Sequence, residues 1–436
     1  MKSYILILAF AVSPLTAADW PQWMGPARDG VWDEPGVEKA DPAAAQLLWE
    51  RPVGGAYAGP AVADGLVLIP SFYRAADQKD TSSGVKGEEE LLALSVADGA
   101  EKWRQRRTES YTFDYNDGPR ATPTVSDGRI YSLGGEGQLI CAELASGKAI
   151  WQHNLKKKLS AKPPIWGFSG HPLIWENLVI CLGAGDSGTC VAFDKMTGKE
   201  AWRALSSRQS GYCPPAITIF AGKPLLILWH GEAINALEPR GGKILWSIPR
   251  ETKNGVTMAA PLYHDGRLLV SNFWWGSKML KLSAGSAAPE LVWETERESD
   301  TRTEHLNALM CSPLLVDGHI YGVCSYGQFR CLEWETGKRR WETFAPTSGK
   351  EVRWGNAFLT RLGRTGNEFL LFSEQGELIR ATLTPEGYKE QSRKKLIEPN
   401  CPDVKDRPVV WVHPAYSNGC VFVRNSTTVR CWRVVP

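Results

Sequence analysis

Tryptophan recurs along this chain at nearly regular intervals, and this interval limits the possible folds more than any other feature. From Trp103 to Trp341, successive copies are separated by 48, 51, 44, 47 and 48 residues. Most copies follow a short turn that contains glycine, as Thr197-Gly198-Lys199 precedes Trp202. A sequence that repeats with a period in this range indicates the stacked sheets of a β-propeller.

A second repeat interleaves with the first and consists of a proline, a short apolar run and an Asp-Gly or Asn-Gly pair. Asp64-Gly65 and Asn418-Gly419 are examples. Such pairs between apolar runs predict two-residue hairpin turns, because both central residues adopt positive φ. With degenerate copies included, we find eight starts, at Pro60, Pro123, Pro172, Pro215, Pro261, Pro313, Ala357 and Pro414.

Each unit predicts four strands, which we name a to d from the proline onward. We therefore predict an all-β fold, an eight-bladed β-propeller of four-stranded antiparallel blades over residues 47–436, after a lead-in segment of residues 19–46. Trp49 lies in a d-type strand without its own a to c, and residues 428–433 read as a c-type strand without its own d. We expect these two ends to pair and close the ring, which removes exposed sheet edges.

The repeated tryptophan of strand d has a structural explanation. A large flat ring fills the gap between neighbouring blades and stacks on a glycine-containing strand. A ring of sugar-stacking tryptophans is the functional alternative, but the period follows the fold. We assign structural docking between blades to Trp49, Trp103, Trp151, Trp202, Trp246, Trp293 and Trp341.

The first residues predict export from the cytoplasm. Residues 1–18 combine one lysine, a short apolar run and small residues, as a secretory signal peptide does, and we place the cleavage after Ala18. No cysteine lies near this position, so we expect no lipid anchor, and no later apolar run is long enough to cross a bilayer. We expect a periplasmic or secreted protein.

The net charge argues against nucleic-acid binding. The chain has 50 Lys+Arg and 48 Asp+Glu, whereas a nucleic-acid-binding protein needs an excess of basic residues to neutralise phosphates.

Export makes the ten cysteines compatible with disulfide bonds. Cys420 faces Cys431, and Cys181 faces Cys190, if each hairpin turns at the Asn-Ser or Gly-Asp pair between its cysteines. A cross-strand bridge is one outcome for such pairs. Buried free thiols are the other, and the sequence leaves both open.

The repeat Ala-x-Asp-x-x-Thr-Gly-Lys-x-x-Trp, seen most clearly in residues 192–202, resembles the tryptophan-docking motif of pyrroloquinoline quinone (PQQ) type propellers. That superfamily includes the quinoprotein alcohol dehydrogenases and the BamB-type proteins of the outer-membrane barrel assembly machine. The resemblance extends from about Asp19 to Pro436, and residues 19–30, 166–170 and 384–388 also resemble exported bacterial PQQ-like repeat proteins. It implies the propeller fold, and it implies either a dehydrogenase or a binding protein.

The dehydrogenases of this superfamily carry a disulfide between adjacent cysteines, and they bind Ca²⁺ beside the quinone through Glu, Asn and Asp. This sequence has no two adjacent cysteines, and the calcium set cannot be placed on it residue by residue. It also lacks the Cys-x-x-Cys-His haem signature and any His spacing typical of a metal site. We therefore predict no catalytic residue, no metal and no cofactor, with PQQ and calcium retained for the alternative of a PQQ-dependent oxidoreductase.

The connections from strand d to the next strand a are long, and these d–a loops share one face with the b–c loops. Long predicted segments include 104–120, 154–170 and 393–412, joined by a b–c insertion at 73–90. Function is often carried on loops above a rigid scaffold. We expect a non-catalytic monomer of the bacterial cell envelope that binds an envelope protein or a small ligand through this face.

Aromatic and arginine side chains on these loops are the candidate contacts, because such residues dominate binding interfaces. Packing of the loops onto the propeller is the alternative role for each of them. Two of the three histidines among them, His171 and His413, immediately precede strand a near the axis. The candidates are Tyr111, Tyr115, Arg120, Trp166, His171, Tyr212, Trp274, Trp275, His305, Arg353, Trp354, Trp411 and His413.

Overall fold

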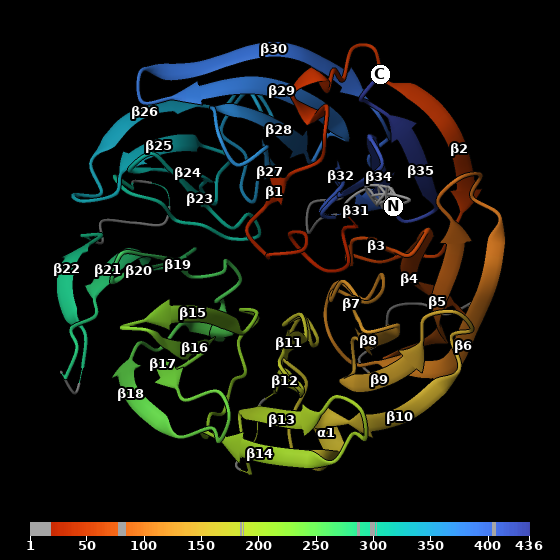
Figure 1. Cartoon of the computed structure of the whole chain (residues 1–436), viewed down its shortest axis with the longest axis horizontal. Helices are drawn as coiled ribbons and strands as arrows, with labels where there is room; N and C mark the ends of the chain where they lie inside the picture. The colour runs from red at the N-terminus through yellow and green to blue at the C-terminus, as the bar shows by residue number, and fades with distance from the viewer. Residues whose placement is uncertain are drawn as a thin grey trace, which may run out of the picture.

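The computed structural model describes residues 19–76, 84–183, 185, 187–285, 288–296, 301, 303–402 and 407–436. Eight blades surround a central axis (Figure 1), which confirms the predicted all-β propeller. Within these ranges, helical structure is limited to α1 (Leu155–Lys158), η1 (Val37–Lys39) and η2 (Lys253–Gly255). No helix in the described residues is long and apolar enough to cross a membrane. The predicted signal peptide lies outside the described residues.

The first four blades follow one another along the chain. Blade 1 contains β3 (Ala61–Ala63), β4 (Leu66–Arg74), β5 (Val85–Ser95) and β6 (Glu101–Tyr111). Blade 2 contains β7 (Thr124–Ser126), β8 (Arg129–Leu133), β9 (Gln138–Glu143) and β10 (Ala149–Asn154). Blade 3 contains β11 (Leu173–Trp175), β12 (Leu178–Leu182), β13 (Cys190–Asp194) and β14 (Glu200–Ala204). Blade 4 contains β15 (Ala216–Phe220), β16 (Lys223–His230), β17 (Ala233–Leu237) and β18 (Ile244–Pro249).

The remaining blades include both ends of the described chain. Blade 5 contains β19 (Leu262–His264), β20 (Arg267–Asn272), β21 (Gly276–Lys281) and β22 (Glu290–Glu294). Blade 6 contains β23 (Leu314–Val316), β24 (His319–Val323), β25 (Phe329–Glu333) and β26 (Arg339–Thr343). Blade 7 contains β27 (Ala357–Leu362), β28 (Glu368–Ser373), β29 (Glu377–Thr384), β30 (Gly387–Lys395) and the added β1 (Val31–Trp32). Blade 8 contains β33 (Ala415–Ser417), β34 (Cys420–Arg424), β35 (Thr428–Arg433) and β2 (Gln46–Pro52).

Blade 8 joins the two ends of the propeller. Its inner three strands come from the C-terminal part of the chain, and its outer strand β2 comes from the N-terminal part. Trp49 of β2 lies opposite Cys431 of β35 in this antiparallel pair. The ring is therefore closed by strand pairing.

The Asp-Gly turns explain the tight a–b hairpins. Asp64 and Gly65 have φ of 49° and 76°, and Asp127 and Gly128 have φ of 51° and 67°. Positive φ at both central residues is the backbone of a type I′ turn, whose twist matches that of the flanking strands. These turns fix where strand a ends and strand b begins in each of these blades.

Six of the seven docking tryptophans donate Nε1 to a main-chain carbonyl in or beside the c–d turn of the following blade. Trp103 Nε1 donates to the Leu144 carbonyl at 3.0 Å. A Cβ on Gly147 would lie 2.5 Å from the Trp103 ring, and a Cβ on Gly198 would lie 2.7 Å from Trp151. Only glycine allows this close approach at positive φ. At five blade junctions the turn glycine and the tryptophan of the preceding blade therefore form one inter-blade contact; these glycines are Gly99, Gly147, Gly198, Gly242 and Gly337.

The lead-in segment crosses the central channel before it joins β2. Val62 N donates to the Trp20 carbonyl at 2.9 Å, and Val125 N donates to the Pro21 carbonyl at 2.8 Å. At the far side of the channel, β1 pairs in parallel with β27. The segment thus runs across the middle of the ring from blades 1 and 2 to blade 7 (Figure 1).

Neither cysteine pair has the predicted register. Cys181 lies opposite Val191, and Cys190 lies opposite Leu182, so their side chains point to opposite faces of blade 3. Cys431 lies opposite Phe422, because the hairpin loop takes four residues, 425–428, instead of two. Both predicted facing pairs are therefore wrong, and Cys420 and Cys431 are diagonal neighbours. All ten cysteines are buried free thiols.

The strands of blade 1 are longer than predicted from the sequence. Residues Arg104–Tyr111, predicted as loop, belong to β6, and most of the predicted 73–90 insertion belongs to β4 and β5. Residues 77–83 of that insertion lie outside the described part of the chain. Glu89 pairs with Arg107, and Glu90 pairs with Arg106 at 2.6 Å. Such opposite-charge pairs across strands stabilise an extended hairpin.

Candidate functional site: the d–a face of the channel

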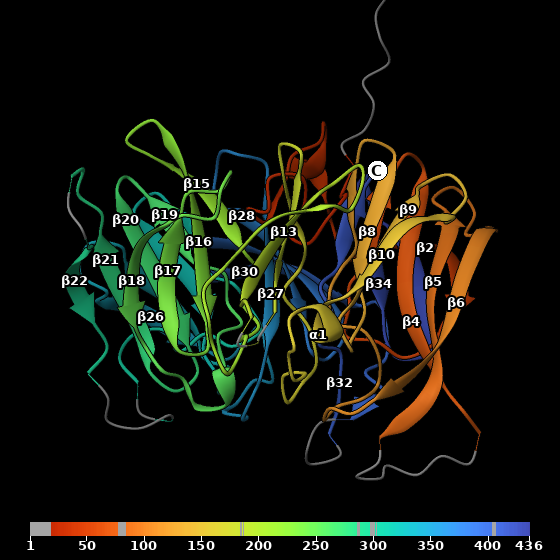
Figure 2. The same cartoon turned by 90° about the horizontal axis from the view of Figure 1, so that it is seen from below.

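The d–a loops lie together on one side of the ring. α1 and β32 (Pro408–Val409), which both belong to these connections, lie toward the same edge of the side view (Figure 2). Together with the β20–β21 connection, these loops line a cavity of about 380 Å³, which we call the d–a cavity. This volume lies within the range of small-ligand sites.

Most of the residues predicted from the sequence line the d–a cavity. These residues come from separate loops. The closed propeller, and not any single sequence motif, brings them together at one cavity. The predicted residues found there are Tyr115, Arg120, Trp166, His171, Tyr212, Trp274, Arg353, Trp354, Trp411 and His413.

Three predicted residues lie outside the cavity lining. Tyr111 is buried in blade 1, where its hydroxyl donates to Glu89 Oε2 at 2.7 Å. His305 stacks on the docking residue Trp293, with ring centroids 5.1 Å apart. The Trp275 amide donates to Asn272 Oδ1 at 2.8 Å within its own turn. The side chains of Tyr111 and His305 therefore serve packing, and the Trp275 main chain forms part of its turn.

Sequence reasoning missed several lining residues, above all Trp23 and Tyr57. Tyr57 lies three residues before Pro60, in the short segment that leads into strand a, and an aromatic residue at that place was a usable signal. Trp23 belongs to the lead-in segment and reaches the cavity only because that segment crosses the channel. No local pattern predicts such a crossing.

Trp23 forms the floor of the cavity with the two histidines. It stacks on His171 at 4.9 Å and meets the edge of His413 at 5.8 Å between ring centroids. The Thr122 amide donates to His171 Nδ1 at 2.9 Å, which places the ring proton of a neutral His171 on Nε2. Burial, helped by the charge of Arg28, lowers the pKa of His171 well below its ordinary value. Burial lowers the pKa of His413 to about 3, so both rings are neutral at pH 7.

The charged groups of the cavity are cations. The Arg120 guanidinium lies 4.4 Å from the Phe113 ring and 5.1 Å from the Tyr57 ring, and donates to the Asp114 carbonyl at 2.9 Å. Its other acceptors are also main-chain carbonyls, and burial lowers its pKa. Arg353 and Lys253 lie over Trp354 and Trp274, at 4.8 Å and 4.9 Å. No carboxylate is found among the described residues of the lining.

Several polar atoms at the cavity have no hydrogen-bond partner in the described part of the chain. They include Ser169 Oγ and Trp274 Nε1. The Tyr212 hydroxyl lies near the Trp166 main chain, without a hydrogen bond of normal geometry. An unsatisfied buried polar group costs about 1–3 kcal/mol. These side chains therefore carry unsatisfied polar atoms in the wall of the cavity.

Trp411 is held in place by the buried carboxylate of Glu374. Trp411 Nε1 donates to Glu374 Oε2 at 3.1 Å, and Ser348 Oγ donates to Glu374 Oε1 at 2.7 Å. Arg407 forms an ion pair with the same carboxylate. Charge-assisted hydrogen bonds of this kind fix side-chain orientation. The Trp411 wall of the cavity is therefore preorganised.

The side chains of the d–a cavity do not fit a calcium-bound quinone. Ca²⁺ takes six to eight oxygen ligands, mostly from carboxylates and carbonyls. The described lining offers no carboxylate, and Asn254 supplies its only side-chain amide. Across the described ranges, no group of three or more His, Cys, Asp or Glu side chains could hold a metal ion. The donor set therefore supports no step through a metal-bound cofactor.

The closed ring of tryptophan-docked blades defines a PQQ-like propeller protein. The chain belongs to the family described as "Outer membrane protein assembly factor BamB", whose model matches residues 87–343. The matched residues include most copies of the tryptophan-docking motif, from Trp103 to Trp341.

Individual relatives include both branches of the superfamily. BamB of Yersinia pestis is 26% identical over 230 residues, which is 52% of this chain and 51% of that protein. BamB of Bordetella pertussis is 27% identical over 275 residues, or 60% of this chain and 66% of that protein. The quinoprotein alcohol dehydrogenase PedH of Pseudomonas putida is 26% identical over 185 residues, or 41% of this chain and 29% of that protein. The chain therefore spans from under a third to two thirds of the length of these relatives.

Solved structures show the same fold. BamB from Moraxella catarrhalis aligns with a TM-score of 0.55 at 14% identity, and covers 89% of this chain and 98% of its own. Quinohemoprotein alcohol dehydrogenase from Comamonas testosteroni aligns with a TM-score of 0.59 at 14% identity, and covers 95% of this chain and 80% of its own. Because one propeller architecture hosts many functions, these likenesses establish the fold alone.

Proposed function

We propose that this protein is a non-catalytic binding protein of the bacterial cell envelope that holds a segment of a partner protein in the d–a cavity. The observation that carries the proposal is the convergence of Trp, Tyr and Arg side chains from separate loops on one cavity. These residue types supply most of the binding energy at protein interfaces. Membership of the BamB family supports an envelope partner. Export through the predicted signal peptide, to the periplasm or beyond, belongs to the same proposal.

The side chains of the cavity also define the chemistry of the segment. Arg120, Arg353 and Lys253 bring positive charge, and the described lining brings no carboxylate. The walls present aromatic faces, including Trp354 and Trp411. Complementary charge favours an acidic segment, and the aromatic walls favour an apolar or aromatic anchor within it. We therefore propose an acidic segment with an aromatic or aliphatic anchor residue.

Site-specific photocrosslinking in the native envelope tests this function. A photoreactive benzoylphenylalanine replaces Arg353, which is exposed at the d–a cavity, or Arg240, which is exposed in a c–d turn on the opposite side. We expect one discrete crosslinked product from position 353 and none from position 240. A Lys253→Glu change in the first variant should weaken that product. Equal products from both positions, or none from position 353, would contradict the proposal.

A quinone-binding function is the second candidate. The similarity to PedH and the aromatic walls of the channel favour it. The absence of carboxylates from the described lining and of adjacent cysteines from the sequence argues against a calcium-assisted quinone site. Titration with PQQ, with and without Ca²⁺, separates the two candidates.

A further inference from the structure

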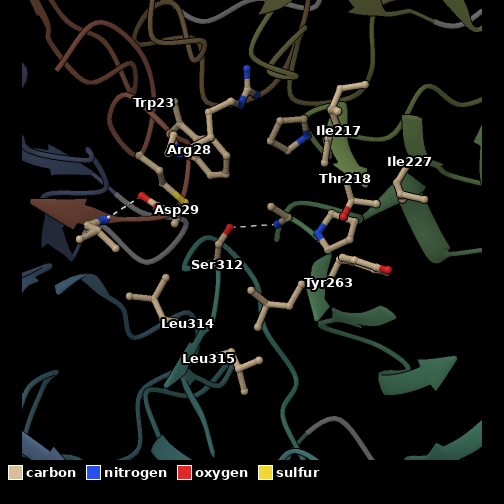
Figure 3. A pocket seen from close by; sticks show the side chains of 18 of the residues that line it. Trp23, Arg28, Asp29, Ile217, Thr218, Ile227, Tyr263, Ser312, Leu314 and Leu315 are labelled. Atoms are coloured by element: carbon tan, nitrogen blue, oxygen red, sulfur yellow. Dashed lines mark hydrogen bonds between the residues drawn. The ribbon is translucent and has the colours of Figure 1, made fainter. Parts of the chain in front are cut away.

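Behind Trp23, on the other side of the lead-in segment, the channel opens into a second and larger cavity of about 580 Å³, which we call the a–b cavity (Figure 3). It is lined by the lead-in segment and by the inward-facing strands of several blades, including β15, β19 and β23. Trp23 lines both cavities. The lead-in segment therefore separates two distinct sites, and the proposed function uses only one of them.

Arg28 gives the a–b cavity a cation without a counterion. Its guanidinium donates to the Pro172 carbonyl at 3.0 Å and to the His171 carbonyl at 3.5 Å. It lies 5.5 Å from the Trp23 ring, and burial lowers its pKa to about 10. No carboxylate in the described residues forms an ion pair with Arg28. A guanidinium has five N–H donors, so two main-chain acceptors leave donors available.

The neighbouring charges do not neutralise Arg28. Asp29 is already engaged, since its carboxylate accepts from Val31 N at 3.2 Å and pairs with Arg364 at 3.0 Å. The cavity lining holds three arginines, Arg28, Arg361 and Arg364, and one carboxylate, Asp29. Arg364 also pairs with Asp33 at 3.1 Å, so both nearby carboxylates are engaged by Arg364 and neither compensates Arg28. An uncompensated cation beside a cavity favours an anionic ligand.

The opposite wall of this cavity is apolar. Figure 3 shows Leu314 and Leu315 across the cavity from Arg28 and Trp23, with Ile217 on a third side. Leu262 completes the aliphatic lining. The Arg28 side of the cavity facing an aliphatic wall matches a molecule with one charged end and one apolar end.

We propose that the a–b cavity binds a small amphiphilic anion, with a carboxylate or phosphate head at Arg28 and an aliphatic body along Ile217, Leu262 and Leu314. Arginine binds carboxylate and phosphate through paired N–H donors, so it recognises both heads. Burial of the aliphatic body against the leucines supplies the remaining affinity. This site lies outside the d–a cavity, so it does not depend on the proposed function.

Calorimetric titration with octanoate, octyl phosphate, 1-octanol and inorganic phosphate tests the site. We expect saturable one-to-one binding of octanoate or octyl phosphate, and the tighter of the two identifies the preferred head. Binding of 1-octanol and of inorganic phosphate should each be at least about tenfold weaker, because each lacks one half of the ligand. No saturable binding of either amphiphilic anion, or 1-octanol binding as tightly as octanoate, would overturn the proposal.

Amino-acid substitutions test whether the ligand binds in the a–b cavity. Arg28→Gln should weaken anion binding about tenfold or more, because the charged head loses its partner. Ile217→Trp fills the cavity without touching Arg28 and should abolish binding even if Arg28→Gln fails to fold. Arg240→Gln, at an exposed site outside the cavity, and Trp354→Ala, in the d–a cavity, should leave binding unchanged. Undiminished binding to a folded Ile217→Trp variant would overturn the proposal.

Discussion

The indole of Trp23 stacks on the imidazole of His171, with ring centroids 4.9 Å apart and ring planes inclined by 11°. This contact joins the lead-in segment to the d–a loop before blade 3. It also separates the d–a cavity from the a–b cavity, because Trp23 lines both. The segment before the propeller is thus a structural part of the channel.

Removal of the Trp23 side chain should therefore join the two cavities and destabilise the protein. Trp23 is 4% exposed. We expect Trp23→Ala to lower the free energy of unfolding by about 3–5 kcal/mol, the usual cost of deleting a buried aromatic side chain. Chemical denaturation measures this loss. Ile219→Ala, at a residue 59% exposed, is the control and should change the same quantity by less than about 0.5 kcal/mol.

Acidification should destabilise the protein through the buried histidines. The pKa of His413 is lowered to about 3 and that of His171 is also lowered, so below pH 6.5 the unfolded chain binds protons that the folded chain excludes. The contribution of the neutral imidazoles to the free energy of unfolding is complete above pH 6.5. For His413 it falls by up to about 1.4 kcal/mol per pH unit as pH drops toward 3, and His171 adds a loss of the same sign. His413→Gln should reduce the slope of unfolding free energy against pH, whereas exposed His264→Gln should not. Equal slopes for wild type and His413→Gln would contradict this account.

The inter-blade contact predicts different costs at two glycines with nearly equal backbone angles. Gly147 and Gly128 have φ of 69° and 67°. A Cβ on Gly147 meets the Trp103 ring at 2.5 Å, whereas one on Gly128 meets nothing within 4 Å. Gly128→Ala should cost about 1–2 kcal/mol of unfolding free energy from backbone strain alone. Gly147→Ala should cost a further 1–3 kcal/mol, roughly, from overpacking. Equal melting temperatures for the two variants would refute the docking role of Trp103.

Loss of Glu374 should disorder the Trp411 wall of the d–a cavity. Glu374→Ala removes the acceptor of Trp411 Nε1 and the carboxylate that pairs with Arg407. We expect a loss of about 1–3 kcal/mol in unfolding free energy, since the buried Trp411 N–H then lacks its acceptor. The photocrosslink from position 353 should weaken in parallel. Glu176→Ala, which removes an exposed ion pair with Arg240, is the matched control and should cost under about 1 kcal/mol.

The blade architecture could be predicted from the sequence, because each blade repeats a local signal. The Asp64-Gly65 turn and the spacing of Trp103 are set within a few residues, so periodicity reveals them. Strand register could not be predicted to the residue, as Cys181 and Cys190 show. A slip of one residue moves every side chain to the other face of a sheet, and the loop between these two cysteines did not have the assumed length.

The candidate site could be predicted only in part, because some of its residues follow the repeat and others depend on contacts distant in sequence. Aromatic residues on d–a loops, such as Trp354 and Trp411, meet at the axis because the ring brings every such loop there. Trp23 and Arg28 reach the channel through contacts with blades distant in sequence, and no local pattern encodes those contacts. Tyr111 shows the opposite error, because a strand longer than expected buries it beside Glu89.

The most direct test of the account is a calorimetric titration of the purified protein with PQQ, in the presence and absence of Ca²⁺. A non-catalytic binding propeller whose cavity offers no carboxylate for calcium should show no calcium-dependent binding of PQQ. Saturable one-to-one binding at micromolar concentration or tighter, strengthened by Ca²⁺, would contradict the account and favour a quinone-dependent oxidoreductase.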